Sequence, residues 1–308
     1  MMPRASGGRR RVTALATGTL AAVLLEAGGP PAFAQAWVPP AGAGSITLLT
    51  QYIDNTGHRL DDGSLLADGK SKNVALYVEA EYAVADRLSL SVGIPYVFAK
   101  YVGPGPSPAN LPVDSCRCWH AGWQDFGITA RVNLLGGAFA LTPSVAYGVP
   151  SHAYNYEGEA VVGRRLQEFR LAVDAGARLD RISPRLAVQG RYAYTFVEQV
   201  LDVPNNRSNI SFEAAFQVTR RLAVRGLLLF QQTHGGLRFP ADITTPELFR
   251  QHDRMLRDNN WRLGAGASYS WSRLDIFGSY VEYVDGTSTH AGRVCTAGVS
   301  WPFEWRLR

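Results

Sequence analysis

Twelve segments of the chain share one length and one pattern, with apolar residues at alternate positions. Alternation of period two is typical of a strand whose two faces meet different surroundings. A bacterial outer-membrane barrel needs an even number of such strands, each about 9 to 11 residues long. The segments are 45–54, 73–83, 88–97, 123–134, 139–149, 166–179, 185–196, 209–218, 222–231, 261–271, 274–283 and 293–303.

The connections between these segments alternate strictly between long and short. The long ones are 55–72, 99–122, 150–165, 198–208, 232–260 and 284–292, and the short ones are 84–87, 136–138, 180–184, 219–221 and 272–273. Outer-membrane barrels have long outer loops and short periplasmic turns. A secreted β-sandwich or propeller, the alternative, has no reason to keep this order. We therefore predict an all-β protein, a single transmembrane antiparallel β-barrel of about 12 strands, over residues 35–308.

The last segment, 293–307, reads RVCTAGVSWPFEWRL and is the candidate closing strand. Its apolar parity ends in three aromatics, Trp301, Phe303 and Trp305, which suits the aromatic girdle of an outer-membrane barrel. Thr296 and Gly298, with Trp301 and Phe303, also resemble the C-terminal targeting signal of bacterial outer-membrane proteins, although residues 304–308 run past the usual terminal aromatic. The expected partners are therefore outer-membrane lipid and, through this strand, the assembly machinery.

The first 34 residues have the features of a cleaved signal peptide. Arg4 and Arg9–Arg11 precede an apolar stretch, 13–25, and Ala32-Phe33-Ala34 forms a cleavage site. We expect export to the bacterial outer membrane and a mature chain that starts at Gln35. Downstream of the leader no run of about 18 apolar residues remains. The mature chain has 27 basic and 25 acidic residues, without a basic cluster, which argues against nucleic acid as a partner.

The parity of each segment predicts which side chains face the lumen. In segment 73–83, Val74, Leu76 and Val78 face lipid, whereas Glu79 and Glu81 face inward, because a slip by one residue would put both acids into hydrocarbon. Segment 274–283 fits least well, since Phe277 takes the inward parity together with Val281. The other charged residues that we predict to line the lumen are Asp125, Arg131, Glu168, Arg170, Asp174, Arg178, Arg191, Glu213, Arg225 and Arg262.

The inward charges admit two interpretations. In a narrow twelve-strand lumen, opposite charges either line a water path or pair across it. Asp174 and Arg191 come nearly opposite each other on adjacent segments, which favours a structural ion pair for these two. The mixture of signs argues against a strongly ion-selective pore.

The outer connections hold three further motifs. Cys116, Cys118 and His120 offer thiolate and imidazole ligands, but the spacing is not that of a zinc finger and a four-ligand site needs another donor. A disulfide or two unpaired thiols is the simpler interpretation in an oxidising compartment. All six histidines lie in the predicted outer connections. Finally, the stretch from Thr245 to Arg257 predicts a short helix with a threonine cap and a proline in its first turn, placed as a lid or as a cover for the rim.

Catalysis is not expected. Ser151 and His152 are adjacent, and neighbouring side chains usually point apart, so we expect no nucleophile and base there. No catalytic residue, cofactor or metal is predicted.

Several stretches resemble an outer-membrane family named for the meta pathway of phenol degradation, whose members are described as transporters or channels. They are ADRLSLSVGIPY (85–96), QDFGITAR (124–131), PSVAYGVPSH (143–152) and GVSWPF (298–303). The resemblance implies a channel that passes small, hydrophobic or aromatic molecules. The alternatives are a structural or surface-interaction barrel whose lumen is closed by arginine–acid pairs, and an outer-membrane enzyme.

Overall fold

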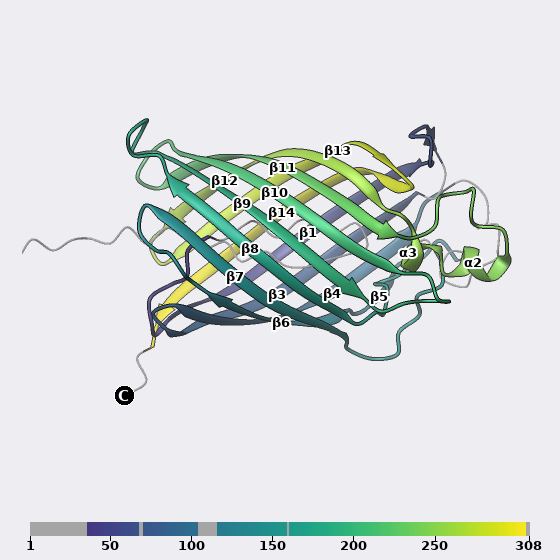
Figure 1. Cartoon of the computed structure of the whole chain (residues 1–308), viewed down its shortest axis with the longest axis horizontal. Helices are drawn as coiled ribbons and strands as arrows, with labels where there is room; N and C mark the ends of the chain where they lie inside the picture. Colours follow the sequence, from purple (N-terminus) through teal and green to yellow (C-terminus); the bar gives the residue numbers. More distant parts are fainter. Residues whose placement is uncertain (1–35, 68–69, 104–115, 159, 306–308) are drawn as a thin grey trace, which may run out of the picture.

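The computed structural model describes residues 36–67, 70–103, 116–158 and 160–305 (Figure 1). The predicted leader, 1–34, and the predicted first mature residue, Gln35, lie outside the described residues. Within the described part of the chain, no helix has the length and apolar character needed to cross a membrane.

The strands form one closed antiparallel sheet, in which each pairs with the next and β14 returns to β1. Two short strands, β2 (Leu65–Leu66) and β5 (His120–Trp123), pair with β1 and β4 outside this ring. The ring confirms the predicted barrel of twelve strands. Its members are β1 (Ala43–Arg59), β3 (Ser71–Ala85), β4 (Leu88–Tyr101), β6 (Asp125–Val132), β7 (Phe139–Pro150), β8 (Glu168–Arg178), β9 (Leu186–Val197), β10 (Asn205–Gln217), β11 (Leu222–Gly235), β12 (Asn259–Trp271), β13 (Leu274–Thr287) and β14 (Thr289–Glu304).

The strand boundaries differ from the predicted ones mainly at one end of the barrel. Segment 123–134 is divided at Gln124, whose N–H donates to the Pro95 carbonyl between β5 and β6. β1 and β11 extend several residues further than predicted, because their backbone hydrogen bonds to the neighbouring strands continue beyond the residues with alternating apolar side chains. Short turns gather at one end, here called the inner end, and the long connections at the other, the outer end (Figure 1). Outer-membrane barrels keep their short turns on the periplasmic side.

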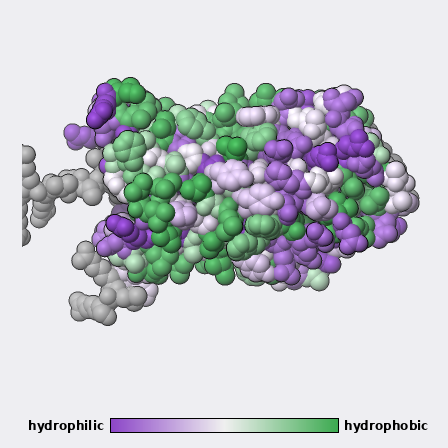
Figure 2. Space-filling model, in the orientation of Figure 1, coloured by the Kyte–Doolittle hydropathy of each residue, from purple (hydrophilic) through white to green (hydrophobic). Residues whose placement is uncertain are grey.

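The outer surface of the barrel wall is apolar. Leu48, Val92 and Ile128 are 51%, 50% and 58% exposed, whereas alternate residues such as Thr47 are buried on the inner face. Figure 2 shows hydrophobic side chains along the wall and hydrophilic ones gathered at the outer end. Trp271 is exposed near the inner end of this surface. An apolar outer surface is what hydrocarbon contact requires, and the exposure of Leu48, Val92 and Ile128 agrees with the lipid-facing parity of their strands.

The predicted helix is present in the connection between β11 and β12, but it is shorter and divided. α2 (Pro246–Arg250) begins at Thr245, whose Oγ1 accepts a hydrogen bond from the Leu248 N–H at 3.2 Å. The helix breaks at Gln251, and α3 (His252–Met255) follows. The expectation that one helix reaches Arg257 is therefore wrong, because the backbone of Leu256 is already extended.

Candidate functional site: the lumen and its two openings

Charged side chains of the lumen are held in close pairs. Arg131 Nη1 lies 2.8 Å from Glu81 Oε1, and both side chains are almost fully buried. Arg191 Nη1 lies 3.3 Å from both carboxylate oxygens of Asp174, which is itself fully buried. This is the pairing that the sequence favours for these two residues. A weaker pair joins Glu213 and Arg225 at 3.8 Å.

Glu168 collects more arginines than the sequence predicts. Arg207 and Arg164 lie 2.5 and 2.9 Å from its Oε1, and the predicted neighbour Arg170 is 3.8 Å from its Oε2. Arg164 and Arg207 lie in the predicted connections 150–165 and 198–208, so the strand pattern does not predict them as lumen residues. Arg207 shares the parity of Glu213, so extending β10 outward by a few residues would have found it.

The other predicted lumen residues lie in varied surroundings. Glu79 is buried on the inner face, and Asp125 accepts a hydrogen bond from the Tyr154 hydroxyl at 2.5 Å. Arg262 lies over the ring of Tyr283, 5.1 Å from its centroid. Arg178 has the inward parity but is the last residue of β8, where it is exposed. It therefore lies at the inner rim rather than deep in the lumen.

A cavity of about 60 Å³ lies among the charged residues, and Tyr77, Glu79, Asp125, Glu168 and Arg170 are in its lining. This volume has room for a few water molecules. The inner faces of β3, β6, β8, β9 and β10, together with Arg225 of β11, are here called the charged wall.

An apolar cluster lies on the opposite part of the lumen wall. Six buried residues form one cluster on β1, β11, β13 and β14, here called the apolar wall: Ile53, Leu227, Leu229, Val281, Tyr283 and Val294. Phe277 is also buried with the inward parity. The poor fit of segment 274–283 is thus explained, because this strand faces lipid on one side and an apolar lumen surface on the other.

The first described residues lie inside the inner opening. Ala36 is fully buried, its N–H donates to Gln189 Oε1 at 3.2 Å, and its carbonyl accepts from Thr142 Oγ1 at 2.6 Å. Arg131 Nη2 also donates to the Trp37 carbonyl at 3.4 Å. Gly176 makes this approach possible, since a Cβ there would lie 2.5 Å from the Ala36 Cβ. No periodic pattern in the sequence predicts this segment.

At the outer opening, the connection 151–167 folds inward. Tyr154 and Val162 pack against Ala75 and Val97 of β3 and β4. Ala160 is buried against Ala99 and Tyr101 of β4. The connection thus reaches from β7 and β8 to the inner faces of strands on the neighbouring arc of the barrel.

The connection 236–258, here called the α2–α3 loop, enters the mouth from the other side. Met255 is fully buried against Leu166, Val197 and Val200. The loop also contacts the connection between β13 and β14, where the Phe239 N–H donates to Ser288 Oγ at 2.9 Å. The loop therefore contacts residues on both sides of β11 and β12, the two strands that it joins.

The two inward connections meet in the mouth. The guanidinium of Arg254 lies 4.0 Å from the centroid of the Tyr156 ring, and its Nη2 donates to the Arg165 carbonyl at 3.4 Å. Side chains from both connections therefore lie across the outer end of the lumen.

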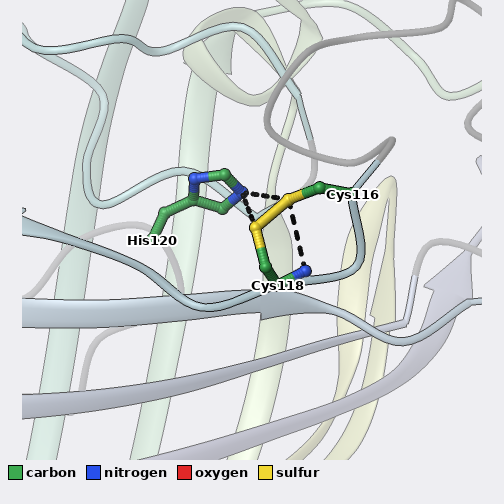
Figure 3. A group of neighbouring side chains, drawn as sticks. All are labelled: Cys116, Cys118 and His120. Atoms are coloured by element: carbon green, nitrogen blue, oxygen red, sulfur yellow. Dashed lines mark hydrogen bonds between the residues drawn. A yellow bond between two sulfur atoms is a disulfide. The ribbon is translucent and has the colours of Figure 1, made fainter.

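Cys116 and Cys118 form a disulfide, and His120 Nε2 lies 3.5 and 3.7 Å from their sulfurs (Figure 3). This agrees with the simpler interpretation of the motif. Disulfide sulfurs offer no thiolate, so metal binding by these three residues would require the disulfide to be reduced first.

Ser151 and His152 do point toward each other, contrary to expectation. Ser151 Oγ lies 2.9 Å from His152 Nδ1, and the serine hydroxyl donates to the Trp123 carbonyl at 3.1 Å. Because the Ser151 hydroxyl proton is used in the hydrogen bond to the Trp123 carbonyl, Ser151 Oγ accepts a hydrogen bond from His152 Nδ1–H. The histidine then acts as a donor in a turn, and a general base would require the opposite arrangement.

Together, the closed ring, the apolar outer surface and the polar pairs inside define an outer-membrane-type β-barrel. The fold is similar to a solved outer-membrane channel from Pseudomonas putida F1, with a TM-score of 0.71 and 13% identity over 89% of this chain and 100% of that one. The NanC porin gives a TM-score of 0.51 and 9% identity over 85% of this chain and 100% of the porin.

At these identities the likeness concerns the fold. No family model matches the chain, and no curated protein matches it either. The resemblance to the meta-pathway family therefore stays a prediction.

The Asp174–Arg191 pair gives a first test of the lumen. Arg191→Gln is expected to lower the melting temperature, because Asp174 is left buried without its nearest positive charge. The shift is measured on the folded barrel in detergent, beside the exposed Arg178→Gln as the control. A lowered conductance with an unchanged melting temperature would mean instead that Arg191 lines a water path.

Proposed function

We propose that the protein is an outer-membrane channel for small molecules that have an apolar or aromatic part. The observation that carries this proposal is the two-sided lumen, in which the apolar wall, including Ile53 and Val281, shares the interior with the charged wall. A solute with an apolar ring and a polar group would have a complementary surface on each side. The balanced charges give neither cations nor anions a strong advantage.

The fold and the sequence support the same function. The barrel is similar to a solved outer-membrane channel, and the resemblance to the meta-pathway family implies small hydrophobic or aromatic solutes. The leader predicted at residues 1–34 would direct the chain to the outer membrane, where the apolar outer surface meets lipid.

The outer connections give this channel a candidate gate. Shortening the α2–α3 loop, by replacing residues 238–256 with a short Gly-Ser linker, is expected to raise single-channel conductance several-fold in a planar bilayer, because a pore conducts through its narrowest part. Arg238→Gln in the same loop is the control, since Arg238 is half exposed and pairs with Asp242 of the same loop. Equal conductance of the shortened and full-length proteins would place the constriction elsewhere.

Solute preference is tested separately by swelling of liposomes that contain the protein. Small aromatic acids are expected to enter faster than sugars of similar size. Equal rates would overturn the assignment to aromatic solutes while leaving a general channel.

A structural barrel is the second candidate, and the buried ion pairs favour it. Pairs such as Glu81–Arg131, at 2.8 Å, join β3 to β6 across β4 without any need for passage. If neither the full-length protein nor the loop-shortened variant conducts, the channel proposal fails and this candidate replaces it.

A further inference from the structure

Two histidines and an aspartate lie together where the α2–α3 loop meets the seam between β1 and β14. His58 and His290 are directly opposite in the register of these strands, and their rings are 4.4 Å apart. Asp253 comes from α3. One ring nitrogen of each histidine and one oxygen of Asp253 all lie within 4.8 Å of one another.

The cluster is withdrawn from solvent. His58 is 1% exposed, and the side chains of His290 and Asp253 are 13% and 9% exposed. A carboxylate at such a site needs a compensating positive charge. Neutral imidazole and carboxylate are the ligands that suit Zn²⁺ and similar divalent ions.

A third histidine is oriented toward the same carboxylate. His252 Nδ1 lies 2.6 Å from the Phe249 carbonyl oxygen, so Nδ1–H donates to it and Nε2 is left to accept. That Nε2 lies 3.3 Å from Asp253 Oδ1. Metal-bound histidines are commonly oriented by this kind of hydrogen bond from the other ring nitrogen.

The spacing favours a metal ion over a shared proton. Ligand atoms on a tetrahedral zinc ion, with bonds of about 2.0 to 2.1 Å, lie about 3.3 Å from one another. His252 Nε2 and His290 Nε2 lie 3.3 and 3.9 Å from the same Asp253 oxygen. A proton on one nitrogen bridges one of these gaps, whereas a metal ion binds all the ligands at once.

We propose that His58, His290 and Asp253 form a binding site for a divalent transition-metal ion of the zinc type, with His252 beside Asp253 as a supporting group. The ion would join β1, β14 and the α2–α3 loop, which are far apart in the sequence. Metal binding would therefore hold the loop in the outer mouth.

Binding is tested on the purified, folded barrel after treatment with a chelator. Titration calorimetry with Zn²⁺ alone is expected to give one ion per chain and a higher melting temperature. His290→Gln and Asp253→Asn are expected to abolish this binding, and His252→Gln to weaken it by about 10- to 100-fold, the range for groups that support a metal site. Asp253→Asn changes only the loop, so it remains informative if the strand variant fails to fold.

His152→Gln is the matched control, because His152 lies in another outer connection, in contact with Ser151. It should bind Zn²⁺ like the wild type. Wild-type protein that binds no Zn²⁺, or cluster variants that bind it unchanged, would overturn the proposal.

The effect on the loop is measured by amide hydrogen exchange, which does not depend on the channel function. Zn²⁺ should slow exchange in residues 236–257 in the wild type and leave it unchanged in Asp253→Asn. Unchanged exchange in wild-type protein that has bound Zn²⁺ would overturn the loop-holding part of the proposal. If the protein does not conduct at all, the proposed function fails while these binding and exchange results still stand.

Discussion

Arg131→Met is expected to destabilise the folded barrel by about 3 to 5 kcal/mol, the usual cost of removing one partner of a buried ion pair. Arg131 Nη1 lies 2.8 Å from Glu81 Oε1, and the Glu81 side chain is 1% exposed. Without the guanidinium, the carboxylate stays in the lumen with its closest positive charge removed. Arg131 also donates to the Trp37 carbonyl, so the variant should loosen the segment in the inner opening as well.

The measurement is urea unfolding of the barrel in lipid vesicles. Arg178→Met is the matched control, because it removes an arginine from an exposed position at the inner rim and should change stability little. The double variant Glu81→Gln, Arg131→Met should recover part of the loss, since no buried charge is then left alone. A loss as large in the double variant as in the single one would show that the cost comes from packing.

Val92→Arg is expected to cost about 2 to 4 kcal/mol, as an arginine does on the lipid face near the middle of the bilayer. Val92 lies within β4 and is 50% exposed on the outer surface. Ser91→Arg places the same side chain one residue away, facing the cavity that Glu79 and Asp125 also line. Its cost should be much smaller, because these carboxylates can accept the guanidinium.

Both variants are compared by the same unfolding measurement. Equal losses for Val92→Arg and Ser91→Arg would contradict the assignment of faces along β4. A larger loss for Ser91→Arg would mean that the cavity is too tight for the added side chain.

Strand facing could be predicted from the sequence because it depends on local alternation. Each strand has lipid on one side, so the alternation within β4 alone predicts that Val92 faces lipid. No information about any other strand is needed. The Asp174–Arg191 pair was also within reach, since the two residues flank one short turn and its register places them opposite each other.

The contents of the two openings could not be predicted in this way. Ala36 lies in the lumen through contacts with β7 and β9, and Met255 through contacts with residues on the far side of the mouth. These contacts follow from the three-dimensional course of irregular segments, which carry no periodic pattern. The histidine cluster has one part of each kind. The register of β1 and β14 places His58 opposite His290, whereas Asp253 is brought to them by the irregular α2–α3 loop.

The seam between β1 and β14 sets an order of events during assembly. Thr47 Oγ1 donates to Ser300 Oγ across a separation of 253 residues, so the first strand obtains its second partner only after the last strand has been made. Until then the edges of both strands carry unpaired backbone groups that are open to other chains. Ala36 is hydrogen-bonded to β7 and β9, which are both made before β14, so its segment can dock in the inner opening before this final pairing closes the ring.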